Sequence, residues 1–209
     1  MDIYSTEQEQ LEAIKKWLRE YAKYIMGAII VVLAISYGWR YWQQEQMGIH
    51  GQASMLFEQG LAAMATNNPA EFQPIAQQLT TQYKSTPYAK LAALLLAKQF
   101  VDAGKLDAAL AQLNWVIENA DNSSLKQIAR IRAARILLAQ QNAKQALALL
   151  QPIDNTSYLP LINEVKGDIL LAMQQPQQAR QAYMQALNLL PADAATRPLV
   201  QMKVNQLAG

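Results

Sequence analysis

Residues 167–191 read GDILLAMQQPQQARQAYMQALNLLP, and this stretch decides the fold of the chain. Apolar residues recur at helical spacing on both sides of the central Gln-Pro turn, which is typical of two antiparallel helices joined by a short connection. Small residues at the crossing let the two helices approach closely. The residues that define the pattern are Gly167, Ala179, Tyr183, Ala186 and Pro191. The stretch therefore predicts a helical hairpin.

The same pattern occurs at two earlier places in the chain. The alanines Ala109, Ala146 and Ala179 align at successive spacings of 37 and 33 residues, close to the tetratricopeptide period of about 34 residues. Twelve residues before each alanine stands a small residue of the preceding helix, namely Ala97, Ala134 and Gly167. The repetition predicts an α-solenoid of tetratricopeptide-like hairpins. An ordinary bundle of Ala- and Leu-rich helices is the alternative, because short apolar repeats arise easily in such helices.

Two further segments complete the predicted solenoid. Residues 51–84 match the pattern weakly and predict a degenerate first unit. Residues 193–207 predict a final helix, which caps the stack because stacked hairpins need a terminal element over their last apolar face. Almost no period-two alternation follows residue 51, so the predicted fold class is all-α.

Residues 24–42 read YIMGAIIVVLAISYGWRYW and predict a membrane-spanning helix. Sixteen uncharged residues lie between Lys23 and Arg40, slightly fewer than the roughly 17 that a bilayer core requires, and Arg40 can extend the span by snorkelling. Tyr and Trp at both ends are typical of membrane interfaces. A buried soluble helix would show a polar stripe, and a cleaved signal peptide would end in small residues. We therefore predict a single, uncleaved N-terminal transmembrane helix.

The basic residues that flank this span predict its orientation. Four of them precede it and only Arg40 follows it in the next forty residues; the four are Lys15, Lys16, Arg19 and Lys23. Because basic flanks stay inside the cell, the N-terminus is predicted to be cytoplasmic and the C-terminal part to lie across a bacterial inner membrane. The predicted parts are a cytoplasmic segment with an amphipathic helix (1–23), the transmembrane helix (24–42), a linker or helix extension (43–50) and a periplasmic tetratricopeptide-like domain (51–209).

The composition offers little for catalysis or for metal and cofactor binding. The chain has no cysteine, and its only histidine is His50, which has no cysteine or second histidine beside it. Metal sites need several convergent ligands, and nucleophilic catalysis needs an activating base beside the nucleophile. A net charge of +2 does not suit a nucleic-acid binder. The sequence therefore predicts a protein that is not an enzyme, with no catalytic, cofactor or metal site.

A stack of helical hairpins instead offers a concave surface for binding. Counting from the small residue of each unit, the first helix of each hairpin presents three side chains to that surface. The resulting nine groove candidates are Leu91, Leu94, Lys98, Ile128, Ile131, Arg135, Leu161, Glu164 and Asp168. Their mixture of apolar side chains and both charge signs suits an extended or partly folded polypeptide. The alternative is that they pack against the next hairpin. Four basic residues, Lys126, Arg130, Arg132 and Arg135, are interpreted as a solvated helix face.

The N-terminal stretch MDIYSTEQEQLEAIKKWL, followed by a span that ends in GWRYW, resembles the YfgM-like ancillary subunits of the SecYEG translocon. Three later stretches are similar to the same family: AKQFVDAGKLDAALAQL from Ala97, IARIRAARILLAQ from Ile128 and QMKVNQL from Gln201. The resemblance covers nearly the whole chain, and the pairing of this N-terminus with GWRYW is fairly specific.

The resemblance implies a bacterial inner-membrane protein with a periplasmic tetratricopeptide-like domain. It also implies association with the SecYEG translocon and with the membrane-anchored periplasmic chaperone PpiD, so that nascent secreted polypeptides are assisted as they emerge. The family has no motif that would supply catalytic residues. Two other functions are compatible with the residues alone: a structural adaptor for another envelope assembly or cytochrome maturation complex, and a regulator that acts through the cytoplasmic helix.

Overall fold

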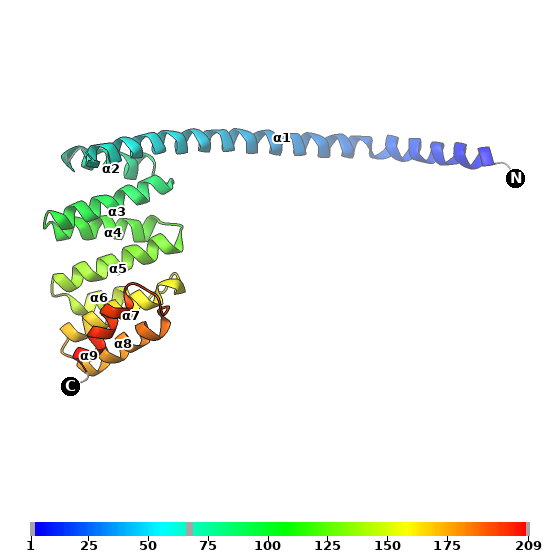
Figure 1. The fold of residues 1–209 in the computed structure, drawn as a ribbon. Coiled ribbons are helices and arrows are strands. Elements are labelled where there is room, and N and C mark those ends of the chain that lie inside the picture. Colours follow the sequence, from blue (N-terminus) through cyan, green and yellow to red (C-terminus); the bar gives the residue numbers. More distant parts are fainter. Residues whose placement is uncertain (1–2, 66–68, 208–209) are drawn as a thin grey trace. The chain divides into compact units, whose positions relative to one another are not determined.

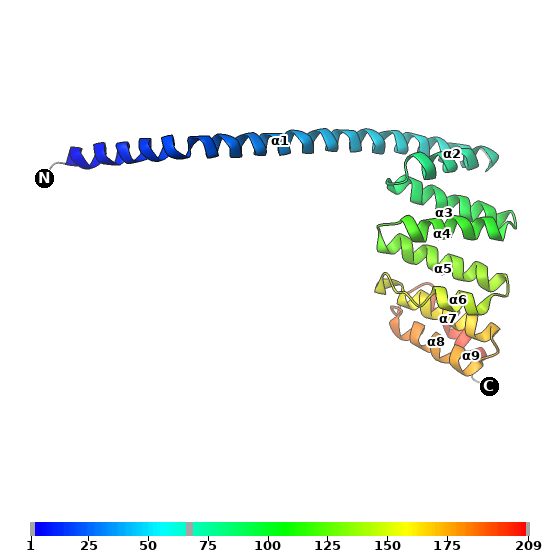
Figure 2. The same cartoon turned by 180° about the vertical axis from the view of Figure 1, so that it is seen from behind.

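The computed structural model describes residues 3–65 and 69–207 of the chain, and every regular element in these ranges is helical. The elements are α1 (Ile3–Ala65), α2 (Pro69–Gln82), α3 (Pro87–Asp102), α4 (Leu106–Asn119), α5 (Ser123–Ala139), α6 (Ala143–Leu149), the 3₁₀ turn η1 (Thr156–Tyr158), α7 (Leu159–Ala172), α8 (Pro176–Leu189) and α9 (Arg197–Gln206). From α3 onward, consecutive helices form antiparallel hairpins stacked in one row, seen from opposite sides in Figure 1 and Figure 2. The predicted all-α class is confirmed.

The contacts within the chain divide it into two units, Met1–Gly51 and Gln52–Gly209. Helix α1 continues through residues 43–50, so the segment predicted as a linker or helix extension is helical. No single straight helix of the described residues is long and apolar enough to cross a membrane by itself. The stretches Ile14–Tyr24 and Met26–Ala65, which meet at a 45° bend, satisfy the requirements of length and composition together.

Local sequence signals fix where the helices of the second unit begin. The Thr86 hydroxyl caps α3 by accepting a hydrogen bond from the Ala89 N–H (3.4 Å), and Pro87 occupies the first helical position. The Asn122 side chain caps α5 by accepting bonds from the Ser124 and Leu125 N–H groups. Such caps satisfy donors that a helix start leaves without partners, and proline there has no donor to satisfy.

The turns inside the three hairpins share one backbone conformation. Gly104, Gln141 and Gln174 have φ angles of +72°, +64° and +59°, and their spacings in sequence equal those of the repeat. In each turn this residue donates its N–H to the carbonyl three residues earlier, and the next residue donates to the carbonyl five residues earlier. Glycine adopts this left-handed conformation without steric cost, whereas glutamine does not. The first turn therefore has a residue suited to its geometry, and the other two turns are strained.

Replacing Gln174 by glycine should consequently stabilise the protein. Relief of the left-handed strain is worth about 1–2 kcal/mol, from which the flexibility of glycine in the unfolded chain removes about 0.5–1 kcal/mol. We expect the free energy of unfolding, measured by urea denaturation, to rise by about 0.5–1 kcal/mol. The matched control is Gln175→Gly, because Gln175 has a φ of −113° and gains nothing from glycine. A rise of equal size in both variants would contradict the prediction.

Apolar side chains join consecutive helices into a continuous core. One cluster links α3, α4 and α5 and includes Ala93, Leu113 and Ala129. A second links α5, α6 and α7, and a third joins α7 and α8 to the final helix α9 through Val200 and Val204. Helix α9 thus covers the last apolar face of the stack, as repeat architectures require.

The small residues predicted to let paired helices approach closely do lie at helix contacts. Ala97 and Ala134 are buried, and Gly167 lies directly against the ring of Tyr183 in α8. In the degenerate first repeat (51–84), Gly60 holds the same small position as Ala97, Ala134 and Gly167. Gly60 in α1 faces Phe72 in α2, whose ring occupies the place that alanine takes in the other units. The large side chain of Phe72 at the alanine position weakens the match of residues 51–84 to the repeat pattern.

Candidate functional site

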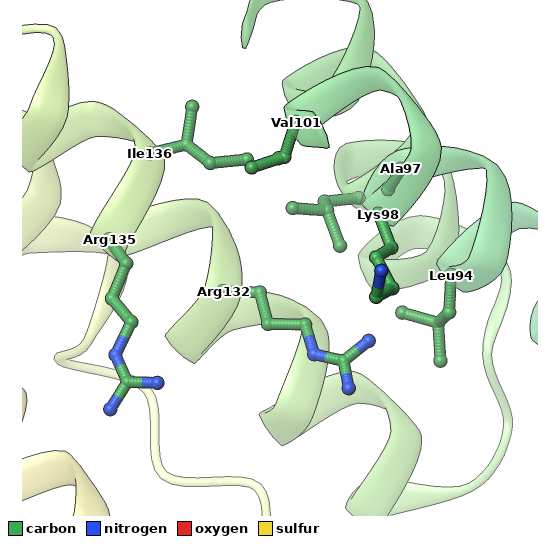
Figure 3. Close-up of a pocket in the computed structure, with 8 residues that line it drawn as sticks. Leu94, Ala97, Lys98, Val101, Arg132, Arg135 and Ile136 are labelled. Atoms are coloured by element: carbon green, nitrogen blue, oxygen red, sulfur yellow. The ribbon is translucent and has the colours of Figure 1, made fainter. Parts of the chain in front are cut away.

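The candidate site is a groove between α3 and α5, with α4 beneath it. It encloses a cavity of about 340 Å³, a size within the usual range of binding pockets. The lining residues are Leu94, Ala97, Lys98 and Val101 from α3, Leu113 from α4, and Arg132, Arg135 and Ile136 from α5 (Figure 3). We call these eight residues the α3–α5 groove. It lies entirely within the second unit.

The floor of the α3–α5 groove is apolar and continuous with the core. Leu94, Ala97, Leu113 and Ile136 are all buried and belong to the cluster that joins α3, α4 and α5. Val101, by contrast, is 41% exposed, although it is a large apolar side chain at the edge of the cavity. The groove therefore exposes an apolar edge above a packed floor.

The rim of the α3–α5 groove carries an excess of positive charge. The Lys98 ammonium pairs with the Asp102 carboxylate at 2.6 Å, an exposed contact within α3. Arg132 and Arg135 are exposed, and among the described residues neither guanidinium has an acceptor within hydrogen-bonding distance. Two arginines three positions apart lie on the same face of a helix. The rim therefore presents two cations without counterions above an apolar floor.

The structure brings three of the nine groove candidates together: Leu94, Lys98 and Arg135 all line the α3–α5 groove. Leu91 is 37% exposed but lies outside the cavity, and Ile128 is half-buried on α5. Ile131 occupies the same repeat position as Leu94 and is likewise buried, but it packs into the cluster that joins α5 to α7. Leu161 packs against that same cluster.

The remaining two candidates, Glu164 and Asp168 on α7, are held by the final helix. The Lys203 ammonium of α9 bonds the Glu164 carboxylate at 2.8 Å and the Asp168 carboxylate at 2.8 and 3.1 Å. The Tyr183 hydroxyl donates a further bond to Asp168 at 2.7 Å. These carboxylates therefore join helices α7, α8 and α9 and are already occupied by partners from the chain itself.

This cluster shifts the pKa values of the groups that carry its protons. Partial burial alone would lower the pKa of Lys203, but its hydrogen bonds to Asp168 and Glu164 and their negative charges outweigh burial and raise it. Burial, followed by the hydrogen bond to Asp168, raises the pKa of the Tyr183 hydroxyl. Both groups hold their protons more tightly in the folded protein than in the unfolded chain.

The free energy of unfolding should therefore fall as the pH rises above about 10. A group whose pKa is raised by folding stabilises the folded state fully at any pH below its pKa in the unfolded chain, which is 10.0 for Tyr183 and 10.5 for Lys203. This stabilisation is lost as the pH rises further. Lys90 acts in the opposite direction, because burial lowers its pKa. Urea unfolding at a series of alkaline pH values measures the net effect. Because Tyr183→Phe removes one titrating group, the free energy of unfolding of this variant should fall less at alkaline pH than that of the wild type. An equal fall in both proteins would contradict the role given to the Tyr183 hydroxyl.

Sequence reasoning missed five residues of the α3–α5 groove: Ala97, Val101, Leu113, Arg132 and Ile136. The sequence pattern groups Arg132 with Lys126, Arg130 and Arg135 as a solvated helix face, but the structure separates these residues. Arg130 bonds the Asp154 carboxylate at 2.7 Å, whereas Arg132 turns toward the cavity (Figure 3). The available signal was the three-residue spacing of Arg132 and Arg135, which places both on one helix face.

Among the residues that the structure describes, no three His, Asp or Glu side chains are grouped in a way that could hold a metal ion. Cations and apolar side chains line the α3–α5 groove, and no carboxylate or hydroxyl side chain is among its eight lining residues. This arrangement can bind an anionic, partly apolar ligand through hydrogen bonds from the two guanidinium groups and through apolar contact.

Comparisons with known proteins match nearly the whole chain. The family model described as a tetratricopeptide repeat-like domain matches residues 15–209. A relative from Escherichia coli (strain K12) is 30% identical over 208 residues, covering 100% of both chains, and one from Neisseria gonorrhoeae is 28% identical, covering 99% and 100%. One from Haemophilus influenzae is 27% identical, covering 98% and 99%. All three are named ancillary SecYEG translocon subunit.

A solved structure of pilF from Pseudomonas aeruginosa shares the fold with a TM-score of 0.58. The two chains are 18% identical, and the match covers 77% of this chain and 69% of the other. The family model and this structural neighbour together establish the tetratricopeptide-like architecture of the helical hairpins.

Proposed function

The chain belongs to the tetratricopeptide-repeat-like family of ancillary SecYEG translocon subunits, and from that premise we propose that it is a non-enzymatic accessory subunit of the protein secretion channel. The observation that carries the proposal is its likeness, along the full length of both chains, to a relative of that name. The α3–α5 groove supports it, because apolar walls and unpaired cations suit binding rather than bond-making chemistry.

We propose that residues 24–42 anchor the protein in a bacterial inner membrane as a single span. Large apolar side chains of α1 are exposed on every side of the helix, for example Ile29 (52%), Leu33 (63%) and Ile35 (65%). Such a surface is stable in lipid and costly in water. The proposed division of the chain is that of the sequence: a cytoplasmic segment (1–23), the span (24–42), a helical connection (43–50) and a periplasmic repeat domain (51–209).

Tethering supplies the proposed mechanism. A binding surface held beside the channel exit meets emerging polypeptides at an effective concentration of about 1 mM. Weak contacts are then sufficient, and a ligand that binds weakly is also released quickly. The proposed partners are SecYEG, nascent secreted polypeptides and the periplasmic chaperone PpiD. The last two are inferred from the groove and from the family resemblance noted in the sequence.

Co-purification tests the association. The full chain, tagged behind Gly209, is extracted with a mild detergent from its native membrane, and the proteins bound to it are identified. SecY, SecE and SecG should be enriched over their recovery with an unrelated tagged single-span protein expressed at the same level. Recovery of a different envelope complex without the three translocon subunits would favour the adaptor function and refute the proposal.

Reporter fusions test the topology separately. Alkaline phosphatase fused behind Gly209 should be active, because the enzyme folds only outside the cytoplasm. Replacing Lys15, Lys16, Arg19 and Lys23 by glutamine should reduce that activity, since flanking basic residues set the orientation of a span. An inactive fusion of the unmodified chain, present at full length in the membrane fraction, would contradict the predicted orientation.

A further inference from the structure

We propose that the α3–α5 groove binds an apolar polypeptide segment carrying a side-chain carboxylate, with Arg132 and Arg135 pairing with that carboxylate. The inference rests on the proposed function, because it names the kind of segment that an accessory subunit of a secretion channel would hold. It also restricts binding to one part of the stack, whereas the sequence pattern distributes nine candidates over three hairpins.

The restriction to the α3–α5 groove follows from what covers the rest of the predicted surface. At the α5–α7 step, Leu138 holds the repeat position of Val101 but packs against the core cluster that also contains the buried Ile131. At the third hairpin, Glu164 and Asp168 already form ion pairs with Lys203 of the chain itself. Between α3 and α5, by contrast, a cavity remains open beside the exposed side chain of Val101.

The charge of the rim selects the ligand. Lys98 is neutralised by Asp102 at 2.6 Å, which leaves Arg132 and Arg135 as the uncompensated charges of the groove. Like charges three or four residues apart on one helix repel each other, and a bound anion relieves that repulsion. A guanidinium group binds carboxylates through two parallel hydrogen bonds. The complementary group in an unmodified polypeptide is therefore the carboxylate of an aspartate or glutamate.

The floor of the groove selects the neighbours of that carboxylate. Leu94, Ala97, Leu113 and Ile136 form an apolar surface beside the two arginines, and Val101 extends it to the edge. A purely acidic segment would leave this surface in water, and a purely apolar one would cover the guanidinium groups without pairing them. A segment that places apolar side chains beside one carboxylate satisfies both parts of the groove.

Binding of matched peptides to the full chain in detergent micelles tests the inference. The probes are fluorescent peptides of about ten residues with blocked ends, in which leucine and valine flank a central glutamate, glutamine or lysine. A fourth probe has the glutamine centre and a free C-terminal carboxylate. Fluorescence anisotropy should show the glutamate peptide binding about tenfold more tightly than the glutamine peptide, and added salt should reduce this difference.

Variants assign the effect to the groove. Arg132→Ala and Arg135→Ala should each weaken binding of the glutamate peptide about fivefold and leave the glutamine peptide unchanged. Val101→Ser should weaken both peptides, because it acts on the apolar edge. The matched control is Lys126→Ala, which removes a positive charge from the same helix outside the cavity and should change neither. Circular dichroism and urea midpoints establish that every variant is folded.

Equal affinities for the glutamate and glutamine peptides, or equal effects of the Lys126 and Arg132 substitutions, would overturn the inference. Preference for the free C-terminus over the central glutamate would assign the groove to chain ends and also overturn it. So would displacement of all peptides alike by a short-chain phosphatidylglycerol, which would indicate a lipid-headgroup site. Co-purification of SecYEG with the wild-type chain and with the Arg132→Ala variant distinguishes the two proposals. If SecYEG co-purifies although the glutamate peptide is not preferred, only the groove assignment is refuted.

Discussion

Gly167→Ala should lower the free energy of unfolding by about 2 kcal/mol. A Cβ atom at this position would lie in steric overlap with the Tyr183 ring, 2.5 Å from Cδ1, 2.8 Å from Cζ and nearer still to Cε1. The ring cannot easily withdraw, because it is 1% exposed and its hydroxyl bonds Asp168 at 2.7 Å. Overpacking of this kind costs about 1–3 kcal/mol, more than the helix propensity that alanine restores. Urea denaturation of the full chain measures the loss.

The other two hairpins provide the control for this prediction. Where Gly167 meets Tyr183, they pair Ala97 with Leu113 and Ala134 with Leu150. Alanine is therefore tolerated opposite leucine and excluded opposite tyrosine. In a Tyr183→Leu background, Gly167→Ala should become neutral or stabilising, because the added methyl group fills space that the smaller side chain leaves. A loss of about 2 kcal/mol in both backgrounds would refute the steric explanation.

The repeat was predictable from the sequence because its signal is the regular spacing of small residues along the chain. Small residues 37 and 33 positions apart mark contacts between paired helices, and such contacts recur with every hairpin. The degenerate first unit was harder to recognise, since Phe72 stands where the pattern expects alanine and Gly60 supplies the missing space.

The candidate site was less predictable, because exposure depends on what the next helix covers. Leu94 and Ile131 hold equivalent repeat positions and are both buried, yet Leu94 lines a cavity between α3 and α5 whereas Ile131 packs against α7. Lys203 contacts a residue 39 positions earlier, and no local periodicity relates such distant residues. Counting from the repeat placed three of the nine candidates in the lining of the α3–α5 groove, while tertiary packing decided which side chains stay open.

Lys203→Met should destabilise the protein by about 3 kcal/mol at neutral pH. Glu164 is 7% exposed and Asp168 is partly buried, so removing the ammonium leaves two neighbouring carboxylates without a cation. An unpaired buried charge typically costs about 3–5 kcal/mol, and the partial exposure of Asp168 places this case at the lower end. The loss should appear mainly as detachment of α9, because Lys203 connects that helix to α7. Hydrogen exchange in α9 would show the detachment directly.

Neutralising the carboxylates separates this electrostatic cost from lost packing. In a Glu164→Gln/Asp168→Asn background, Lys203→Met should cost much less than in the wild-type chain, since no charge is left without a partner. The amide oxygen that Asp168→Asn introduces can still accept the Tyr183 hydroxyl, which keeps the α7–α8 contact comparable. Lys166→Met, on α7 and with no ionic partner among the described residues, should change stability by less than about 0.5 kcal/mol. If Lys203→Met were equally costly in both backgrounds, the charges of Glu164 and Asp168 would not explain the loss, and their ion pairs with Lys203 would contribute nothing to closing the end of the stack.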